Sequence, residues 1–177
     1  MDKFTRTLSL LGAGAAFVVA APALAAPPST TAVVASPAAT ARAQIVDPLT
    51  LTKTSDLDFG TLVKKTTLGA AETVVIDESG VVTCTTNLLC SGTPTAASFD
   101  VAGSADQVVK VYIAASTLTA PGGATLTFTP SSSAVTTSPV LDGSGNASFK
   151  VAGSIDVAST TASGIYVGNM DVTVDYN

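Results

Sequence analysis

The chain has 177 residues and a formal net charge of −5, from 8 Lys and Arg against 13 Asp and Glu, with two Cys and neither His nor Trp. The absence of His excludes triad-type hydrolases, histidine metal sites and imidazole proton transfer. An acidic chain with so few cations also lacks the basic surface that nucleic acid binding requires. We therefore expect no enzymatic activity, no cofactor, no metal site and no nucleic acid partner.

Residues 1–25 have the three parts of a secretory signal peptide. Lys3 and Arg6 give a basic start, residues 8–21 are uncharged and mainly apolar, and Ala23-Leu24-Ala25 has the small residues that signal peptidase requires. We expect cleavage after Ala25, which leaves a domain-sized chain exported to the periplasm and then to the cell surface or outside the cell. The apolar run is short for a bilayer span, so a retained anchor is the weaker alternative, and no membrane span is expected after cleavage.

Cys84 and Cys90 are the only cysteines of the chain. An exported chain enters an oxidising compartment, where a disulfide between the only available pair is the expected state. It would close a short loop and act as a local staple. Free thiols, or a metal or redox site, are the alternatives.

Residues 26–44 are rich in Ala, Pro, Ser and Thr, and Arg42 is their only charged residue. This composition is typical of a flexible linker, which is one interpretation. From residue 33 onward, however, small and apolar residues occupy alternate positions, and a period of two predicts a strand with one buried face. The residues on that face are Val33, Ala35, Pro37, Ala39, Ala41 and Ala43.

From residue 45 to residue 177 the pattern is one of short strands and turns, and no segment longer than a turn shows helical spacing. Strands are predicted within 49–52, 57–62, 74–76, 81–82, 98–101, 109–113, 125–129, 149–151, 155–157 and 169–176. Residues 77–80 and 141–146 predict turns, the second a hairpin turn rather than a calcium loop. This series of short strands predicts an all-β domain over 45–177, an immunoglobulin-like antiparallel β-sandwich.

Several motifs between Ile45 and Asn177 resemble the domain of unknown function 4402 family of exported bacterial proteins. The matching segments are Val46-Asp47-Pro48-Leu49-Thr50-Leu51-Thr52, Asp56-Leu57-Asp58-Phe59-Gly60, Ser98-Phe99-Asp100-Val101-Ala102-Gly103, Leu141-Asp142-Gly143-Ser144-Gly145, Ser163-Gly164-Ile165-Tyr166 and the closing Val172-Thr173-Val174-Asp175-Tyr176-Asn177. The resemblance implies a fold more firmly than it implies a function.

The C-terminal part also resembles chaperone–usher pilins, the subunits of bacterial surface fibres. Gly164 is the fourteenth residue from the end, Tyr176 is the penultimate one, and apolar and polar residues alternate between Met170 and Tyr176. The resemblance implies an immunoglobulin-like, pilin-like sandwich that lacks one strand and leaves its last strand open. The candidate acceptor edge then comprises Gly164, Met170, Val172, Val174 and Tyr176.

In such a fibre, residues 31–45 of a neighbour would be the donor strand, with the alternating face of the N-terminal extension turned inward. Head-to-tail contacts of this kind do not close, so the product would be a secreted structural fibre. The resemblance also implies a periplasmic chaperone and an outer-membrane usher as partners. The alternative function is a self-contained, monomeric cell-surface binding or adhesion domain, with residues 26–44 as a linker.

Overall fold

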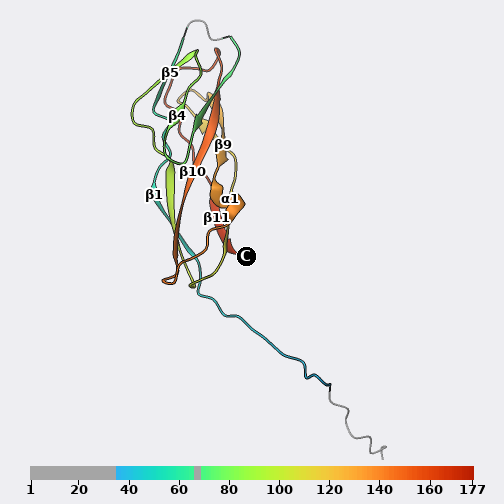
Figure 1. Cartoon of the computed structure of the whole chain (residues 1–177). Helices are drawn as coiled ribbons and strands as arrows, with labels where there is room; N and C mark the ends of the chain where they lie inside the picture. The colour runs from blue at the N-terminus through green and yellow to red at the C-terminus, as the bar shows by residue number, and fades with distance from the viewer. Residues whose placement is uncertain (1–34, 66–68) are drawn as a thin grey trace, which may run out of the picture. The chain divides into compact units, whose positions relative to one another are not determined.

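The computed structural model describes residues 35–65 and 69–177, so the expected signal peptide and Val33 lie outside the described residues. Residues 35–49 form neither helix nor strand. Gln44–Asn177 forms one compact unit, called the body below (Figure 1). The described elements of the body are β1 (Thr50–Ser55), β2 (Thr61–Lys64), β3 (Glu72–Ile76), β4 (Val82–Thr83), β5 (Leu88–Ser91), β6 (Ala97–Ala102), β7 (Val109–Ile113), β8 (Ser116–Thr119), β9 (Thr125–Ser131), α1 (Ser133–Thr137), β10 (Asn146–Val157) and β11 (Val172–Tyr176).

β10 is the longest strand and organises the body. Its first half pairs with β6, and its second half pairs with β3 and β9 on its two edges. β1 extends this sheet beyond β6, β4 extends it beyond β3, and β8 extends it beyond β9. β11 pairs with β7, and β2 pairs with β5, as two-stranded sheets. These pairings are all antiparallel, which confirms the predicted all-β antiparallel sandwich.

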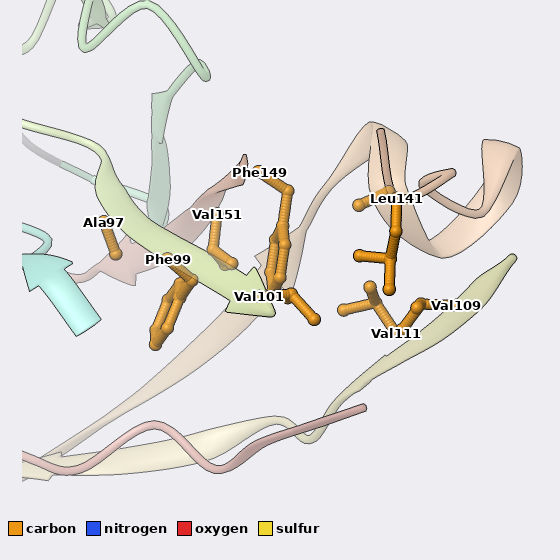
Figure 2. Close-up of a cluster of buried hydrophobic side chains, with 9 residues drawn as sticks. Ala97, Phe99, Val101, Val109, Val111, Leu141, Phe149 and Val151 are labelled. Atoms are coloured by element: carbon orange, nitrogen blue, oxygen red, sulfur yellow. The ribbon is translucent and has the colours of Figure 1, made fainter. Parts of the chain in front are cut away.

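Two clusters of buried apolar side chains lie along β10. Cluster A surrounds its second half, where the rings of Phe59 and Phe128 meet edge to face with centroids 6.2 Å apart. Cluster B lies between the sheet formed by β6 and the first half of β10 and the strand β7, and there the rings of Phe99 and Phe149 stack at 5.4 Å (Figure 2). Cluster B comprises Ala97, Phe99, Val101, Val109, Val111, Ala134, Leu141, Phe149 and Val151.

The predicted strands at 149–151 and 155–157 are in fact one continuous strand. Gly153 lies in the middle of β10, and a Cβ at this position would lie 2.5 Å from a ring carbon of Phe128 and 2.5 Å from the carbonyl oxygen of Thr129. Glycine therefore does not interrupt the strand. It provides the space in which β9 and its buried ring cross close to the β10 main chain.

The predicted strand at 57–62 is shorter than expected, because β2 begins only at Thr61. Gly60 has a φ of 73°, which breaks the extended conformation before it. A Cβ on Gly60 would also lie 2.5 Å from the carbonyl oxygen of Ser91, so the turn and the start of β2 need glycine there. β5, β8 and α1 lie outside the predicted elements.

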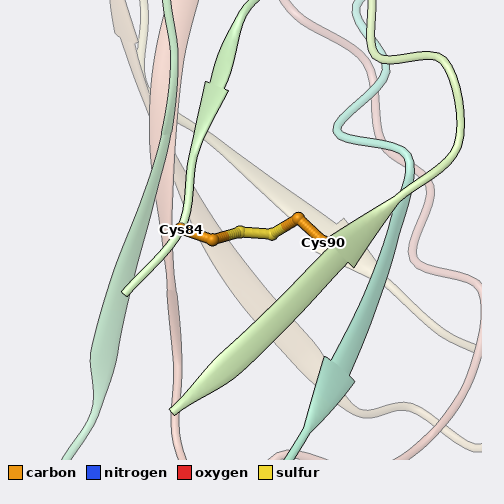
Figure 3. Close-up of a disulfide and its surroundings, with 2 residues drawn as sticks. All are labelled: Cys84 and Cys90. Carbon is orange, nitrogen blue, oxygen red and sulfur yellow. A yellow bond between two sulfur atoms is a disulfide. The ribbon is translucent and has the colours of Figure 1, made fainter. Parts of the chain in front are cut away.

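The predicted disulfide is confirmed, since Cys84 and Cys90 are joined with their Cα atoms 6.2 Å apart (Figure 3). Cys84 follows β4 and Cys90 lies in β5. Both side chains pack against cluster A. The bond therefore fastens the β2–β5 ribbon to the end of the large sheet.

Both predicted turns are present. The Asp77 carboxylate accepts hydrogen bonds from the hydroxyl of Ser79 at 2.6 Å and from the N–H of Val81 at 2.9 Å, and these bonds lower its pKa. The N–H groups of Asn146 and Ser144 donate to Asp142 at 2.9 and 2.8 Å and lower its pKa in the same way. The second turn closes onto the first residue of β10, since the N–H of Asp142 donates to the carbonyl oxygen of Asn146 at 2.9 Å. Before the turn, Val140 bridges to Val108 next to β7, so the chain leading into the turn does not continue as a strand paired with β10.

Candidate functional site

β11 has a strand partner on only one of its edges in the part of the chain that the structure describes. It pairs with β7 in a register that sets Val172 opposite Ile113 and Tyr176 opposite Val109. An unpaired edge presents main-chain N–H and C=O groups to any strand that approaches it, which makes it a site for strand addition.

The hydrogen bonds to β7 identify which main-chain groups of β11 face the open edge. The N–H of Asn177 donates to Val108 at 3.0 Å, and the N–H of Ala114 donates to the carbonyl oxygen of Asp171 at 3.2 Å. Odd-numbered residues from 171 to 177 therefore direct their main-chain groups to β7, since this direction alternates along an antiparallel strand. The N–H and C=O groups of the even-numbered residues point to the open edge.

The side chains of these same even-numbered residues point inward. Val172, Val174 and Tyr176 pack against cluster B and are half-buried, and Met170, just before β11, contacts both clusters. Thr173 and Asp175 are exposed on the opposite face. Four of the five predicted acceptor residues are thus brought together along one open edge, with apolar side chains that the body covers only in part.

The strand β1 is the second open edge beside cluster B. It is the terminal strand of the large sheet and pairs only with β6 among the described strands. Leu51, and Leu49 just before the strand, pack against cluster B and remain partly exposed. Open strands of two different sheets therefore contribute incompletely covered side chains to one core.

Gly164 is not part of this edge. It lies in the exposed segment that precedes β11, and a Cβ on it would approach the Cβ of Ala120 to 3.2 Å. Gly164 therefore packs beside Ala120, directly after β8, and does not contribute to the open edge of β11.

The hydroxyl group of Tyr176 joins three distant segments. It donates to the carbonyl oxygen of Asp47 at 2.7 Å and accepts from the N–H of Ser104 at 2.8 Å. The N–H of Asp47 in turn donates to the hydroxyl of Ser104 at 2.7 Å. Gly103 leaves room for this junction, since a Cβ there would lie 2.4 Å from the phenol oxygen and 2.8 Å from Leu49. No local sequence signal indicates it, because Asp47 and Tyr176 are 129 residues apart.

The predicted donor residues that the structure describes lie in an exposed segment without secondary structure. Ala35, Pro37, Ala39, Ala41 and Ala43 are all exposed, and so are the polar residues between them. Ile45, at the start of the body, is 95% exposed. The period-two pattern therefore has no strand partner among the described residues of this chain.

Open hollows also lie elsewhere on the surface of the described residues. One, of about 390 Å³, is lined by side chains of β1, β6 and β10 such as Thr50, Asp100 and Asn146. Another, of about 580 Å³, lies between α1 and the same sheet and includes Lys150 and Glu78. Within residues 35–65 and 69–177 no three His, Cys, Asp or Glu side chains are grouped as metal ligands would be. The same residues contain no helix of the length and apolarity needed to cross a membrane.

Comparison with known proteins agrees with the predicted family. A family model described as a domain of unknown function (DUF4402) matches residues 49–176, which include every described strand of the body from β1 to β11. No curated protein and no solved structure matches the chain. The match spans both clusters and the β7–β11 ribbon, and the chain therefore belongs to the domain of unknown function 4402 family.

Proposed function

We propose that the protein is a secreted structural subunit of a bacterial surface fibre, which polymerises when the N-terminal extension of one copy adds a strand to β11 of the next. The observation that carries this proposal is the open edge of β11. Its even-numbered residues combine free main-chain groups with half-buried apolar side chains over cluster B. An added strand would satisfy both at once.

The exposed extension supports the second half of the proposal. A segment with alternating small residues and no partner in its own chain has the pattern of a strand that pairs elsewhere. Because donor and acceptor lie on different parts of the chain, each copy can donate to one neighbour and accept from another. Such head-to-tail contacts produce a linear polymer.

Export is part of the proposal. The disulfide between Cys84 and Cys90 fits an oxidising compartment, where such bonds form and persist. An open edge exposes a subunit to aggregation before it is filled, so a periplasmic chaperone that covers β11 and an outer-membrane usher are the proposed partners.

A complementation experiment tests the proposal. The acceptor subunit lacks residues 26–44 and keeps β11, and the donor subunit keeps the extension and carries Val174→Lys, which places a charge among the half-buried side chains of the edge. Neither should polymerise alone, whereas a mixture should give heterodimers that resist detergent without boiling. Thr127→Lys, at an exposed position of β9, which does not pair with β11, is the control and should leave the polymer ladder of the intact chain unchanged.

The proposal fails if the intact protein is monomeric at high concentration with or without the extension, or if the two subunits do not combine. Circular dichroism establishes that the donor subunit is folded. A ladder that persists after deletion of residues 26–44 would also contradict strand donation.

A self-contained, monomeric surface binding or adhesion domain is the second candidate. It is favoured by the completeness of the two clusters, since Val74, Ile76, Val101, Val109 and Val151 are all less than 2% exposed without any added strand. It predicts that residues 45–177 alone unfold reversibly in a two-state transition. The same midpoint in the presence and absence of an extension peptide would support this second function.

A further inference from the structure

We propose that the β11 edge binds residues 37–43 of a second copy in one antiparallel register, with Arg42 beside Asp171 and Pro37 beside Tyr176. This inference rests on the proposed function, because it names which residues of the donor meet which residues of the acceptor edge. The alternation of side chains and the charges beside the edge together select the register.

The alternation restricts the register to every second residue. Even-numbered residues of β11 face cluster B and odd-numbered ones are exposed. Residues directly opposite each other in an antiparallel pair share a face of the sheet. All strand pairs of the body are antiparallel, and we take the added strand to pair with β11 in the same way. For their side chains to face cluster B, Ala39 and Ala41 of the donor must lie opposite even-numbered residues of β11. The polar residues Thr40 and Arg42 then lie opposite the exposed ones.

Charge complementarity selects the partner of Arg42, which is the only charged residue in 26–44. The exposed candidates are Thr173 and Asp175 of β11 and Asp171, which directly precedes the strand. Neither Asp171 nor Asp175 forms an ion pair within the described residues. Asp175 lies opposite Lys110 of β7, which already places a cation beside it, whereas Asp171 lies opposite Ala114. A cation on the open side of β11 is therefore most favourable beside Asp171.

In this register Pro37 lies opposite Tyr176. Pro37 has no N–H to donate, and the N–H of Tyr176 already donates to the carboxylate of Asp175 at 2.8 Å. This pair therefore forms no main-chain hydrogen bond, and the ladder of the added strand ends at Val174.

With Arg42 opposite Asp171, the pairs between them follow directly. Ala41 lies opposite Val172, Ala39 opposite Val174, and Thr40 opposite Thr173, a pair of hydroxyl side chains on the exposed face. The two alanine positions are those where β11 has free N–H and C=O groups, so they form the hydrogen-bonded pairs of the new ladder. Small side chains also suit a core that Val172 and Val174 already cover in part.

Cysteine cross-linking tests the register in directed heterodimers. Thr40 and Thr173 would form a non-hydrogen-bonded pair, whose Cα atoms are about 4.5 Å apart and within disulfide range. A donor subunit with Thr40→Cys and an acceptor subunit with Thr173→Cys should therefore cross-link on mild oxidation. A donor with Ala38→Cys is the matched control and should not cross-link to the same acceptor, because it lies two residues away.

Each outcome is decisive. Heterodimers that cross-link through residue 38 and not through residue 40 would overturn the register and leave the proposed function intact, whereas the absence of heterodimers would contradict the proposed function itself. The intact chain with both Thr40→Cys and Thr173→Cys, which needs no Val174 variant, should give cross-linked oligomers. A disulfide within a single monomer would identify the chain's own extension as the occupant and overturn the inference.

Charge reversal tests the ion pair. Arg42→Asp in the donor should weaken heterodimer formation about threefold at low ionic strength, the size expected of an exposed pair. Asp171→Arg in the acceptor should restore it, whereas Asp175→Arg, the matched control on the same strand, should not. Rescue by Asp175→Arg alone, or no rescue by either variant, would refute the assignment of Arg42 to Asp171.

Discussion

The junction at Tyr176 makes the sharpest prediction for stability. Tyr176→Phe removes a hydroxyl group that makes two hydrogen bonds, one to the carbonyl oxygen of Asp47 and one from the N–H of Ser104. Each neutral hydrogen bond contributes about 1 kcal/mol to stability. Because the site is only partly buried, we expect a loss of about 1–2 kcal/mol in the free energy of unfolding. Tyr112→Phe is the control, since the Tyr112 side chain is 54% exposed.

Gly103→Ala perturbs the same junction from the other side. The added Cβ would lie 2.4 Å from the Tyr176 oxygen and 2.8 Å from a methyl carbon of Leu49. Such overpacking costs about 1–3 kcal/mol. The closest contact is with the hydroxyl oxygen, so part of this cost should disappear once the oxygen is removed. In the Tyr176→Phe background we expect Gly103→Ala to cost about 1 kcal/mol less than in the intact protein.

Urea unfolding of the purified monomer, followed by far-ultraviolet circular dichroism, measures the four corners of this double-mutant cycle. The midpoints are compared only where the dependence on urea is unchanged. The reasoning is refuted if Gly103→Ala lowers the free energy of unfolding by the same amount in the intact protein and in the Tyr176→Phe variant. The glycine would then not be needed to make room for the Tyr176 hydroxyl.

Three further predictions concern the rest of the body. Replacing Cys84 and Cys90 by Ser should lower the free energy of unfolding by about 2 kcal/mol, and reductant should shift the urea midpoint of the intact protein to the same value and leave that of the variant unchanged. Gly153→Ala should lower the free energy of unfolding by about 1–3 kcal/mol, because the added Cβ meets the buried ring of Phe128. Gly143→Ala should leave it nearly unchanged, because a Cβ there has no atom within 4 Å. The lowered pKa of Asp142 stabilises the folded state above the pKa of the unfolded chain, near 4, and this contribution is lost as pH falls through the lower folded pKa. Asp142→Asn should therefore reduce the loss of stability between about pH 5 and pH 2, and an unchanged pH profile would contradict this assignment.

Strands with one buried face could be predicted from the sequence because burial alternates along them. In β7, Val109 and Val111 are buried while Lys110 and Tyr112 are exposed, and the sequence shows the same alternation. β6, β9 and β11 follow the same rule. A period of two therefore carries enough information where one face of a strand meets a core and the other meets water.

The missed elements lack that signal for physical reasons. β8 has Leu118 as its only apolar residue, so it shows no hydrophobic pattern, and it forms because β9 pairs with it. β5 contains Leu89, which is 58% exposed and lies opposite the exposed Val63 of β2. Apolar residues on the outer face conceal the alternation.

The helix α1 also depends on tertiary contacts. Four of its five residues, Ser, Val and two Thr, have low helix propensity. Ser132 caps the helix, and the Glu78 carboxylate accepts hydrogen bonds from the N–H and hydroxyl groups of Ser133. Ala134 is buried in cluster B. Local sequence could not predict a helix whose cap comes partly from a turn 55 residues away.

The acceptor edge could be predicted only as a pattern, since alternation indicates which side chains point inward but not which edge is unpaired. The junction at Tyr176 adds what the pattern could not show, namely that the end of β11 is hydrogen-bonded to Asp47, where the extension enters the body. In the proposed fibre, each subunit accepts a strand at β11 and donates its own extension to the next subunit. Within that subunit, the hydrogen bond from Tyr176 to Asp47 connects the end of β11 to the start of the donated extension. Tension along the fibre would pass from one donated strand to the next through β11 and this junction. The two buried clusters would then carry little of this tension. A subunit that receives only small side chains from its neighbour could therefore still serve as a structural link.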